Sequence, residues 1–209
     1  MALVLVSGRA FAEEEAVSNV LSVDALGLTR RELQLEGERV LSERIGVRLG
    51  VSLSFSDVRI GREDPILSDN GAVIARSELN IQGFGAAVEP GLRVYLTGRA
   101  PEGLWIGPQL GVGVSRSTTE SRSERTQQSS TRDSRVVTLS GAALVGYSVI
   151  LPKGITLQVA AGVGTSQLSI SEWPVHGSST GEPVPNVPPG RSYRWETQPL
   201  TRLALGWAF

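Results

Sequence analysis

Strict alternation between apolar and small or polar residues is the feature that most constrains how this 209-residue chain can fold. In Ile45–Phe55 every odd-numbered residue is apolar, and every even-numbered residue is Gly, Ser or Arg. Successive side chains of a β-strand point to opposite faces, so this period predicts a strand with one apolar face. The same pattern recurs from about residues 84, 104, 137, 155 and 195, whereas helical periodicity is scarce.

Eight strands are expected in total. Two weaker alternating stretches precede Ile45, and we interpret them as strands over residues 17–28 and 31–41, joined by a tight turn near Thr29. The expected connections alternate between short turns at 41–44, 97–103 and 151–154 and long, solvated polar loops at 56–78, 115–134 and 166–192. This alternation is typical of transmembrane barrels. The sequence therefore predicts an all-β fold, a closed antiparallel up-and-down transmembrane β-barrel of about eight strands.

The residues opposite the apolar faces favour a membrane barrel over a soluble one. A soluble barrel of this size fills its interior with large apolar side chains, but these faces carry Gly, Ser, Gln, Glu and Arg. We expect the apolar faces to meet lipid and the charged residues to form a lumen charge network of Glu36, Glu38, Arg48, Glu89, Arg93, Glu196 and Arg202. Unpaired charges in a closed lumen are costly. The network therefore forms either a salt-bridged plug, which we favour, or a narrow polar channel.

Aromatic residues and two prolines give further expectations about the strands. The aromatics cluster near strand ends and predict two interfacial girdles, one with Tyr95, Trp105, Tyr147, Trp207 and Phe209 and the other with Phe55, Tyr193 and Trp195. Pro90 and Pro108 fall inside strands, where each removes a hydrogen-bond donor. A hairpin centred near Ala100 would place the prolines close together, and one local bulge would then absorb both.

The C-terminal stretch Leu203-Ala-Leu-Gly-Trp-Ala-Phe209 ends in an aromatic residue after alternating apolar residues. It resembles the assembly signal of bacterial outer-membrane barrels, which implies that the barrel-insertion machinery reads Leu203, Leu205, Trp207 and Phe209. With Leu35–Val47 and Tyr95–Pro108, the chain resembles a bacterial outer-membrane β-barrel family of unknown function, similar to the small eight-stranded outer-membrane barrels. This resemblance, in outline over residues 17–209, implies a place among outer-membrane lipids and no particular activity.

The first 16 residues form a separate N-terminal segment. An apolar run, Met1–Val6, leads to the triplet Ala10-Phe11-Ala12, although no positively charged start precedes it. A small-x-small triplet after an apolar run is typical of the end of a secretory signal. For residues 1–16 we therefore favour a signal-peptide remnant over an ordinary N-terminus, and we expect residues 17–209 to be the barrel domain.

Composition excludes several classes of function. Without Cys, the chain has no disulfide, zinc-thiolate site or Cys nucleophile. Its net charge is −1 and no basic patch is interleaved with aromatics, so we expect no nucleic-acid partner. The acidic residues lack calcium-loop spacing, and the glycines do not open a helix as a phosphate-binding loop requires. We expect a monomer with no metal and no cofactor.

Three functional hypotheses remain. The first is a barrel with a structural or surface-interaction role. The second is an enzyme acting on envelope lipid, because His176, Ser178 and Glu182 superficially resemble the residues of barrel enzymes that deacylate lipid A. A catalytic triad needs a rigid mount, whereas His176 is expected in a solvated loop, so we predict no enzyme activity. The third is a soluble lipocalin-like carrier with an apolar interior.

Overall fold

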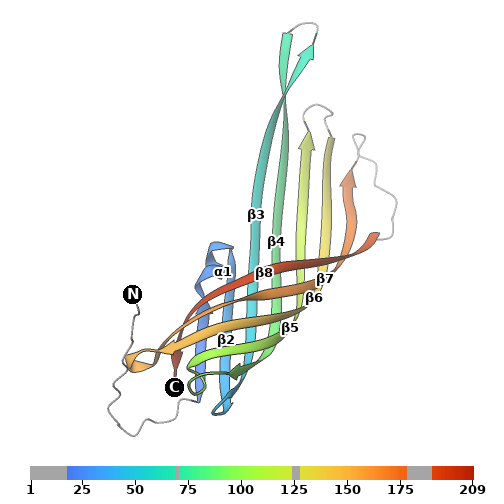
Figure 1. The fold of residues 1–209 in the computed structure, drawn as a ribbon. Helices are drawn as coiled ribbons and strands as arrows, with labels where there is room; N and C mark the ends of the chain where they lie inside the picture. Colours follow the sequence, from blue (N-terminus) through green and yellow to red (C-terminus); the bar gives the residue numbers. More distant parts are fainter. Residues whose placement is uncertain (1–17, 69–70, 124–127, 178–189) are drawn as a thin grey trace.

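The computed structural model describes residues 18–68, 71–123, 128–177 and 190–209. Eight antiparallel strands, each paired with the next in the chain, close into a barrel through a β8–β1 pairing (Figure 1). The strands are β1 (Asn19–Asp24), β2 (Glu32–Ser42), β3 (Ile45–Ser68), β4 (Gly71–Tyr95), β5 (Gly103–Ser123), β6 (Gln128–Ile150), β7 (Ile155–Gly177) and β8 (Gly190–Ala208). The predicted closed, eight-stranded, up-and-down barrel is confirmed.

The connection between β1 and β2 differs from the expected tight turn. The first strand ends at Asp24 and is followed by a short helix, α1 (Ala25–Thr29). The Asp24 carboxylate accepts a hydrogen bond from the Leu26 amide at 2.9 Å and so caps the helix. The other helical element is the 3₁₀ turn η1 (Pro152–Gly154) between β6 and β7. None of the helices in the described residues is long and apolar enough to cross a membrane.

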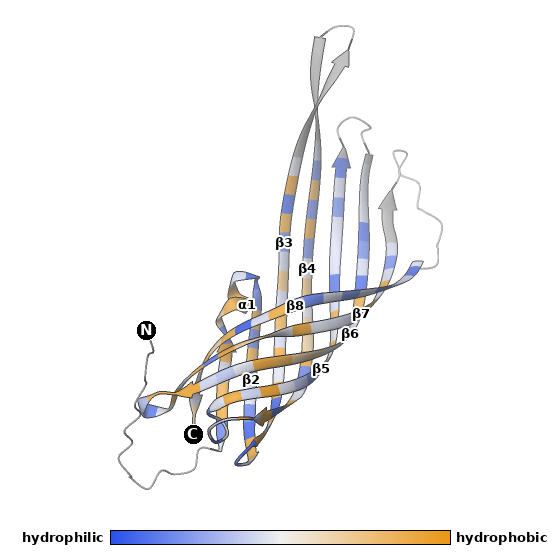
Figure 2. Ribbon diagram, in the orientation of Figure 1, coloured by the Kyte–Doolittle hydropathy of each residue, from blue (hydrophilic) through white to orange (hydrophobic). Residues whose placement is uncertain are grey.

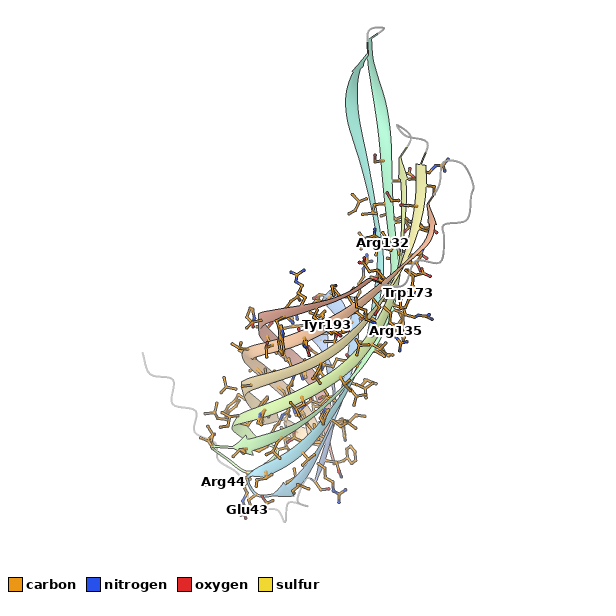
Figure 3. All side chains as sticks on the ribbon, turned by 90° about the vertical axis from the view of Figure 1, so that its right-hand side faces the viewer. Glu43, Arg44, Arg132, Arg135, Trp173 and Tyr193 are labelled. Atoms are coloured by element: carbon orange, nitrogen blue, oxygen red, sulfur yellow. The ribbon has the colours of Figure 1, made fainter. Side chains whose placement is uncertain are left out.

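The wall of the barrel is uneven in height. β1 pairs with β8 only from Val20–Asp24, and the β2–β3 pairing stops at Glu32 and Ser54. By contrast, β3–β7 continue as a sheet that rises well beyond α1 (Figure 1). We call the described residues within 56–83, 116–135 and 170–192 the sheet extension, and the rest of the barrel the ring. The C-terminus lies at the opposite end of the molecule from the sheet extension, as does the short turn at Glu43 and Arg44 (Figures 1 and 3).

The sheet extension corrects the prediction of long polar loops. Residues 56–78 and 115–134 belong largely to hairpins whose strands pair residue by residue. In one such pair, the Thr118 hydroxyl donates to the Asp133 carboxylate at 2.8 Å. Most of the third expected loop before residue 178 is strand β7, while residues 178–189 lie outside the described residues. Strands of the extension need no apolar face, because both of their faces meet water. The polar composition of these residues therefore did not reveal that the strands continue beyond the ring.

The predicted sense of the two faces is confirmed. In the ring, the large apolar residues of alternating positions, such as Leu49, Leu110 and Leu139, are exposed on the outside, whereas polar residues such as Ser22 and Gln158 are buried inside. Figure 2 shows hydrophobic residues recurring along the ring and hydrophilic residues in the upper parts of β5 and β6. The barrel therefore has an apolar outer surface and a polar interior.

Two aromatics predicted for a girdle lie in the interior instead. Tyr95 and Trp105 are each only 1% exposed. Their direction follows from the alternation, because even-numbered residues of β4 and β5 face outward in the ring and both of these positions are odd. The remaining predicted girdle residues are exposed: Phe55, Tyr147, Tyr193, Trp195, Trp207 and Phe209.

The two strand prolines do not produce the predicted bulge. Strands β4 and β5 keep one register from Val88–Val112 to Val94–Ile106, with no shift between them. The prolines instead fall where pairing is interrupted, and this register places Pro90 opposite residue 110 and Pro108 opposite residue 92, as expected. Each missing donor is thus accommodated by a local gap in the ladder.

Candidate functional site

Six of the seven charged residues predicted for the lumen meet inside the ring. Glu36, on β2, lies at the centre of this lumen cluster and forms ion pairs with three arginines. Its carboxylate lies 2.8 Å from Nη2 of Arg48 and 3.2 Å from Nη1 of Arg202, and it also pairs with Arg93. These residues come from β2, β3, β4 and β8, so the cluster connects distant parts of the wall.

Arg93 is enclosed on several sides. Its guanidinium pairs with the carboxylates of Glu36 and Glu38 and lies 4.2 Å from the centre of the Trp105 ring. The Tyr95 hydroxyl donates to Glu38 at 2.7 Å. Carboxylates and the face of an aromatic ring both favour a cation. The buried guanidinium is therefore matched by partners of suitable chemistry.

Glu89 forms the other arm of the lumen cluster. It accepts hydrogen bonds from Nη2 of Arg202 at 2.7 Å and from the Gln34 amide at 2.8 Å, and it lies 3.7 Å from Arg48. Glu89 and Arg93, predicted to share a network, are linked through Arg202 and Glu36. The cluster is continuous across the lumen and contains three carboxylates and three guanidinium groups, so its formal charge is zero.

Inward-facing glycines make room for these long side chains. A Cβ at Gly46 would lie 2.2 Å from Oε1 of Glu38, and a Cβ at Gly146 would lie 2.4 Å from the Trp105 ring. The close alternation of Gly with apolar residues in the sequence thus has a packing cause. Small residues on the inner face give the space that the charged and aromatic side chains occupy.

Glu196 does not join the lumen cluster. It lies further along β8 and forms an ion pair with Arg194 at 3.0 Å, with its side chain 41% exposed. The alternation predicted its face but not its height along the strand. Because Glu196 is closer to the sheet extension than Arg202 is, it pairs locally where water reaches it.

Several polar residues of the interior were not among the predicted site residues. Gln109 accepts a hydrogen bond from Nη1 of Arg48 at 2.5 Å, and the Ser148 hydroxyl accepts one from the Trp105 indole at 2.9 Å. Gln34 completes the partners of Glu89. The alternation along each strand was the available signal, because these residues lie on the strand face opposite the one that carries the outward apolar residues.

The lumen cluster leaves little space in the ring. A cavity of about 10 Å³ borders Glu36, Arg93 and Trp105, which is room for about one water molecule. A second cavity, of about 170 Å³, lies on the α1 side and is bordered by Arg30, Glu89 and other polar residues. No group of acidic or His residues suited to a metal ion occurs in the described part of the chain.

The described interior bears on both alternative hypotheses. A lipocalin-like carrier requires an apolar interior, and the buried charges of the lumen cluster contradict it. His176 lies in β7, where its backbone pairs with that of Thr131, and not in the loop that the sequence predicted. Ser178 and Glu182, the other two residues of the enzyme hypothesis, lie outside the described residues.

Comparisons with known proteins give one similar solved structure. No protein-family model and no curated protein matches the sequence. The crystal structure of a major outer membrane protein from Thermus thermophilus has 14% sequence identity and a TM-score of 0.44, over 93% of this chain and 100% of that chain.

Proposed function

We propose that this chain is a plugged β-barrel of the bacterial outer membrane, in a Gram-negative type of envelope, with a structural or surface-interaction role. The observation that carries the proposal is the reversed polarity of the ring, with apolar side chains exposed outside and paired charges buried inside. Water would not favour such an outer surface, whereas lipid does. Closure of the sheet satisfies the backbone groups that lipid cannot.

The dimensions of the outer apolar surface support a membrane-spanning ring. On β3 the outward residues are apolar throughout Ile45–Phe55 and are followed by the outward Asp57. A tilted transmembrane strand needs roughly 9–11 residues. The apolar stretch of β3 therefore matches one bilayer crossing, and the sheet extension begins where that crossing ends.

The orientation that we propose places the sheet extension outside the cell. Short turns of bacterial outer-membrane barrels face the periplasm and longer loops face outward. The turn at 43–44, the 96–102 connection and η1 all lie at the end away from the extension. Surface interactions would then be made by the extension, and the surroundings of the ring would be outer-membrane lipids.

The single lysine gives a direct test of location and orientation. Lys153 lies in η1, whereas the extension carries several exposed arginines, among them Arg122 and Arg132. After membrane fractionation, we expect the protein with outer membranes. In intact cells trypsin should cleave it, and a lysine-specific protease should cleave it only after the outer membrane is permeabilised. Recovery in the soluble fraction, or lysine-specific cleavage in intact cells, would contradict the proposal.

The lumen cluster supports a plug in preference to a channel, because its side chains bridge the ring and leave only small cavities. Purified barrel in a planar bilayer should show no steady conductance. The double variant Glu36→Ala/Arg93→Ala removes two opposite charges together and keeps the lumen neutral. This variant should conduct, because it removes side chains that bridge the lumen. Steady conductance in the wild type would contradict a plug formed by the cluster.

The proposed role involves no catalysis, no cofactor, no nucleic acid and no second subunit. Purified protein should release no acyl chains from lipid A, and His176→Ala should behave like the wild type. Clear acyl release that this substitution abolishes would instead favour the enzyme hypothesis.

We also propose that the outward residues Leu203, Leu205, Trp207 and Phe209 of the last strand region are read by the barrel-insertion machinery. Phe209 is 62% exposed, but its backbone exchanges hydrogen bonds with Asn19. Phe209→Ala keeps these bonds, so it is a cleaner test than deletion. Refolding in detergent should be unchanged, whereas the amount inserted in cells should fall several-fold. Equal insertion would contradict the signal.

A further inference from the structure

The outward face of β5 and β6 changes abruptly from apolar residues to arginine. From the short turns upward, the apolar stretch of β5 covers residues 104–114 and ends at the cross-strand pair Val114–Val137. Its length is that of one tilted transmembrane strand, roughly 9–11 residues. The next outward pair is Arg116 and Arg135, directly opposite each other. In a membrane barrel this pair lies at the level of the lipid headgroups.

The pairing of these two arginines is unfavourable on its own. Like charges directly opposite each other on neighbouring strands destabilise a sheet. Both side chains are exposed, and no carboxylate in the described residues forms an ion pair with either of them. The nearby Asp133 accepts its hydrogen bond from Thr118 instead. An anion bound between the guanidinium groups would remove the repulsion.

A hollow on the same face provides the space for such an anion. It has a volume of about 440 Å³ and is lined by Gln82, Arg116, Thr118, Asp133, Arg135 and Trp173. Trp173 is the register partner of Asp133 and is therefore diagonal to Arg135 on neighbouring β7. Figure 3 shows Arg135, Trp173 and Tyr193, from three successive strands, close to where the sheet extension leaves the ring.

We propose that Arg116, Arg135 and Trp173 bind the phosphate-bearing headgroup of a lipid in the outer leaflet. This inference rests on the proposed outer-membrane location. Guanidinium groups bind phosphate through paired, charge-assisted hydrogen bonds, and Trp is favoured at the level of the headgroups. The apolar pairs Val114–Val137 and Val112–Leu139 lie directly below the arginines and give the acyl chains a surface. A phosphate-bearing lipid matches both the arginine pair and the apolar surface below it, whereas free phosphate matches only the arginine pair.

Native mass spectrometry of the refolded barrel in detergent tests this site. The probes are dioleoyl phosphatidate, dioleoylglycerol without phosphate, and inorganic phosphate. The double variant Arg116→Gln/Arg135→Gln is compared with Arg59→Gln/Arg122→Gln, which removes the same charge from exposed arginines elsewhere in the extension. We expect the first variant to bind phosphatidate about tenfold more weakly, since two exposed charge contacts together are worth about that factor. The second should bind like the wild type.

The outcomes separate this inference from the proposed function. Heat-modifiable migration of every variant in electrophoresis shows that the barrel is folded, independently of lipid binding. Equal phosphatidate binding by both double variants would overturn the site. Equal binding of dioleoylglycerol, or displacement of phosphatidate by an equimolar amount of inorganic phosphate, would overturn the choice of a phosphorylated lipid.

Discussion

The ring and the sheet extension are built from the same continuous strands, yet they treat charged residues in opposite ways. In the ring, Arg48 and Glu36 are almost fully buried and lie 2.8 Å apart within a larger cluster. In the extension, Arg132 and Glu172 are 3.5 Å apart with side chains 62% and 47% exposed. A buried charge must have partners, whereas an exposed one is already solvated. The surroundings of a strand, and not its residue types, therefore decide what each charge costs.

The largest expected difference between the two regions concerns single carboxylates. Glu36→Ala would leave Arg48, Arg93 and Arg202 without their shared partner, so the free energy of unfolding should fall by about 3–5 kcal/mol. Glu120→Ala, at an exposed position of the extension, should change it by no more than about 0.5 kcal/mol. Urea unfolding in lipid vesicles measures both variants. Similar losses would show that the ring does not depend on its buried pairs.

Two exposed valines of β3, one on the outer face of the ring and one on the opposite face of the sheet extension, compare the surroundings of the two regions. Val51 in the ring and Val58 in the extension have nearly equal exposed fractions, 40% and 42%. Val51→Arg should cost about 2–4 kcal/mol because the residue meets lipid. Val58→Arg should be near neutral because that residue meets water. If both substitutions were neutral in vesicles, the ring would not be embedded in lipid.

The coupling between paired charges gives the smallest expected effects. A double-mutant cycle on Arg202 and Glu89, in the lumen, should give a coupling energy of about 1–3 kcal/mol. The same cycle on Arg132 and Glu172, in the extension, should give about 0.5 kcal/mol or less. Equal coupling energies in the two cycles would remove the contrast between the regions.

Much of the ring could be predicted from the sequence because its period is local. Alternation in Ile45–Phe55 gives both the strand and the direction of every side chain. The same parity identified the six charged residues of the lumen cluster. The same parity assigns Tyr95 and Trp105 to the inner face, where the structure places them. We expected them at the membrane interface because aromatic residues near strand ends suggested a girdle.

The sheet extension and the first connection could not be read in this way. Residues 116–123 and 128–135 have polar residues on both faces, so their composition resembles a loop although the ladder continues through them. The short helix after Asp24 depends on a cap and on contacts with β8, which no periodic pattern reveals. Glu196 shows a third limit, since parity gives a face but not a height along a tilted strand.

The seam between β1 and β8 has a consequence for the dynamics of the ring. Its ladder contains five residue pairs, as the β1–β2 ladder does, whereas the β3–β4 ladder contains 24, and β1 makes fewer contacts with β8 than with β2. Segments with few contacts open with the lowest free energies. Amide protons of Val20–Asp24 should therefore exchange with solvent before those of the ring part of β3. The β1–β8 pairing, beside α1, would therefore be the first strand pairing of the barrel to open. The same pairing would be the last to form when the chain assembles.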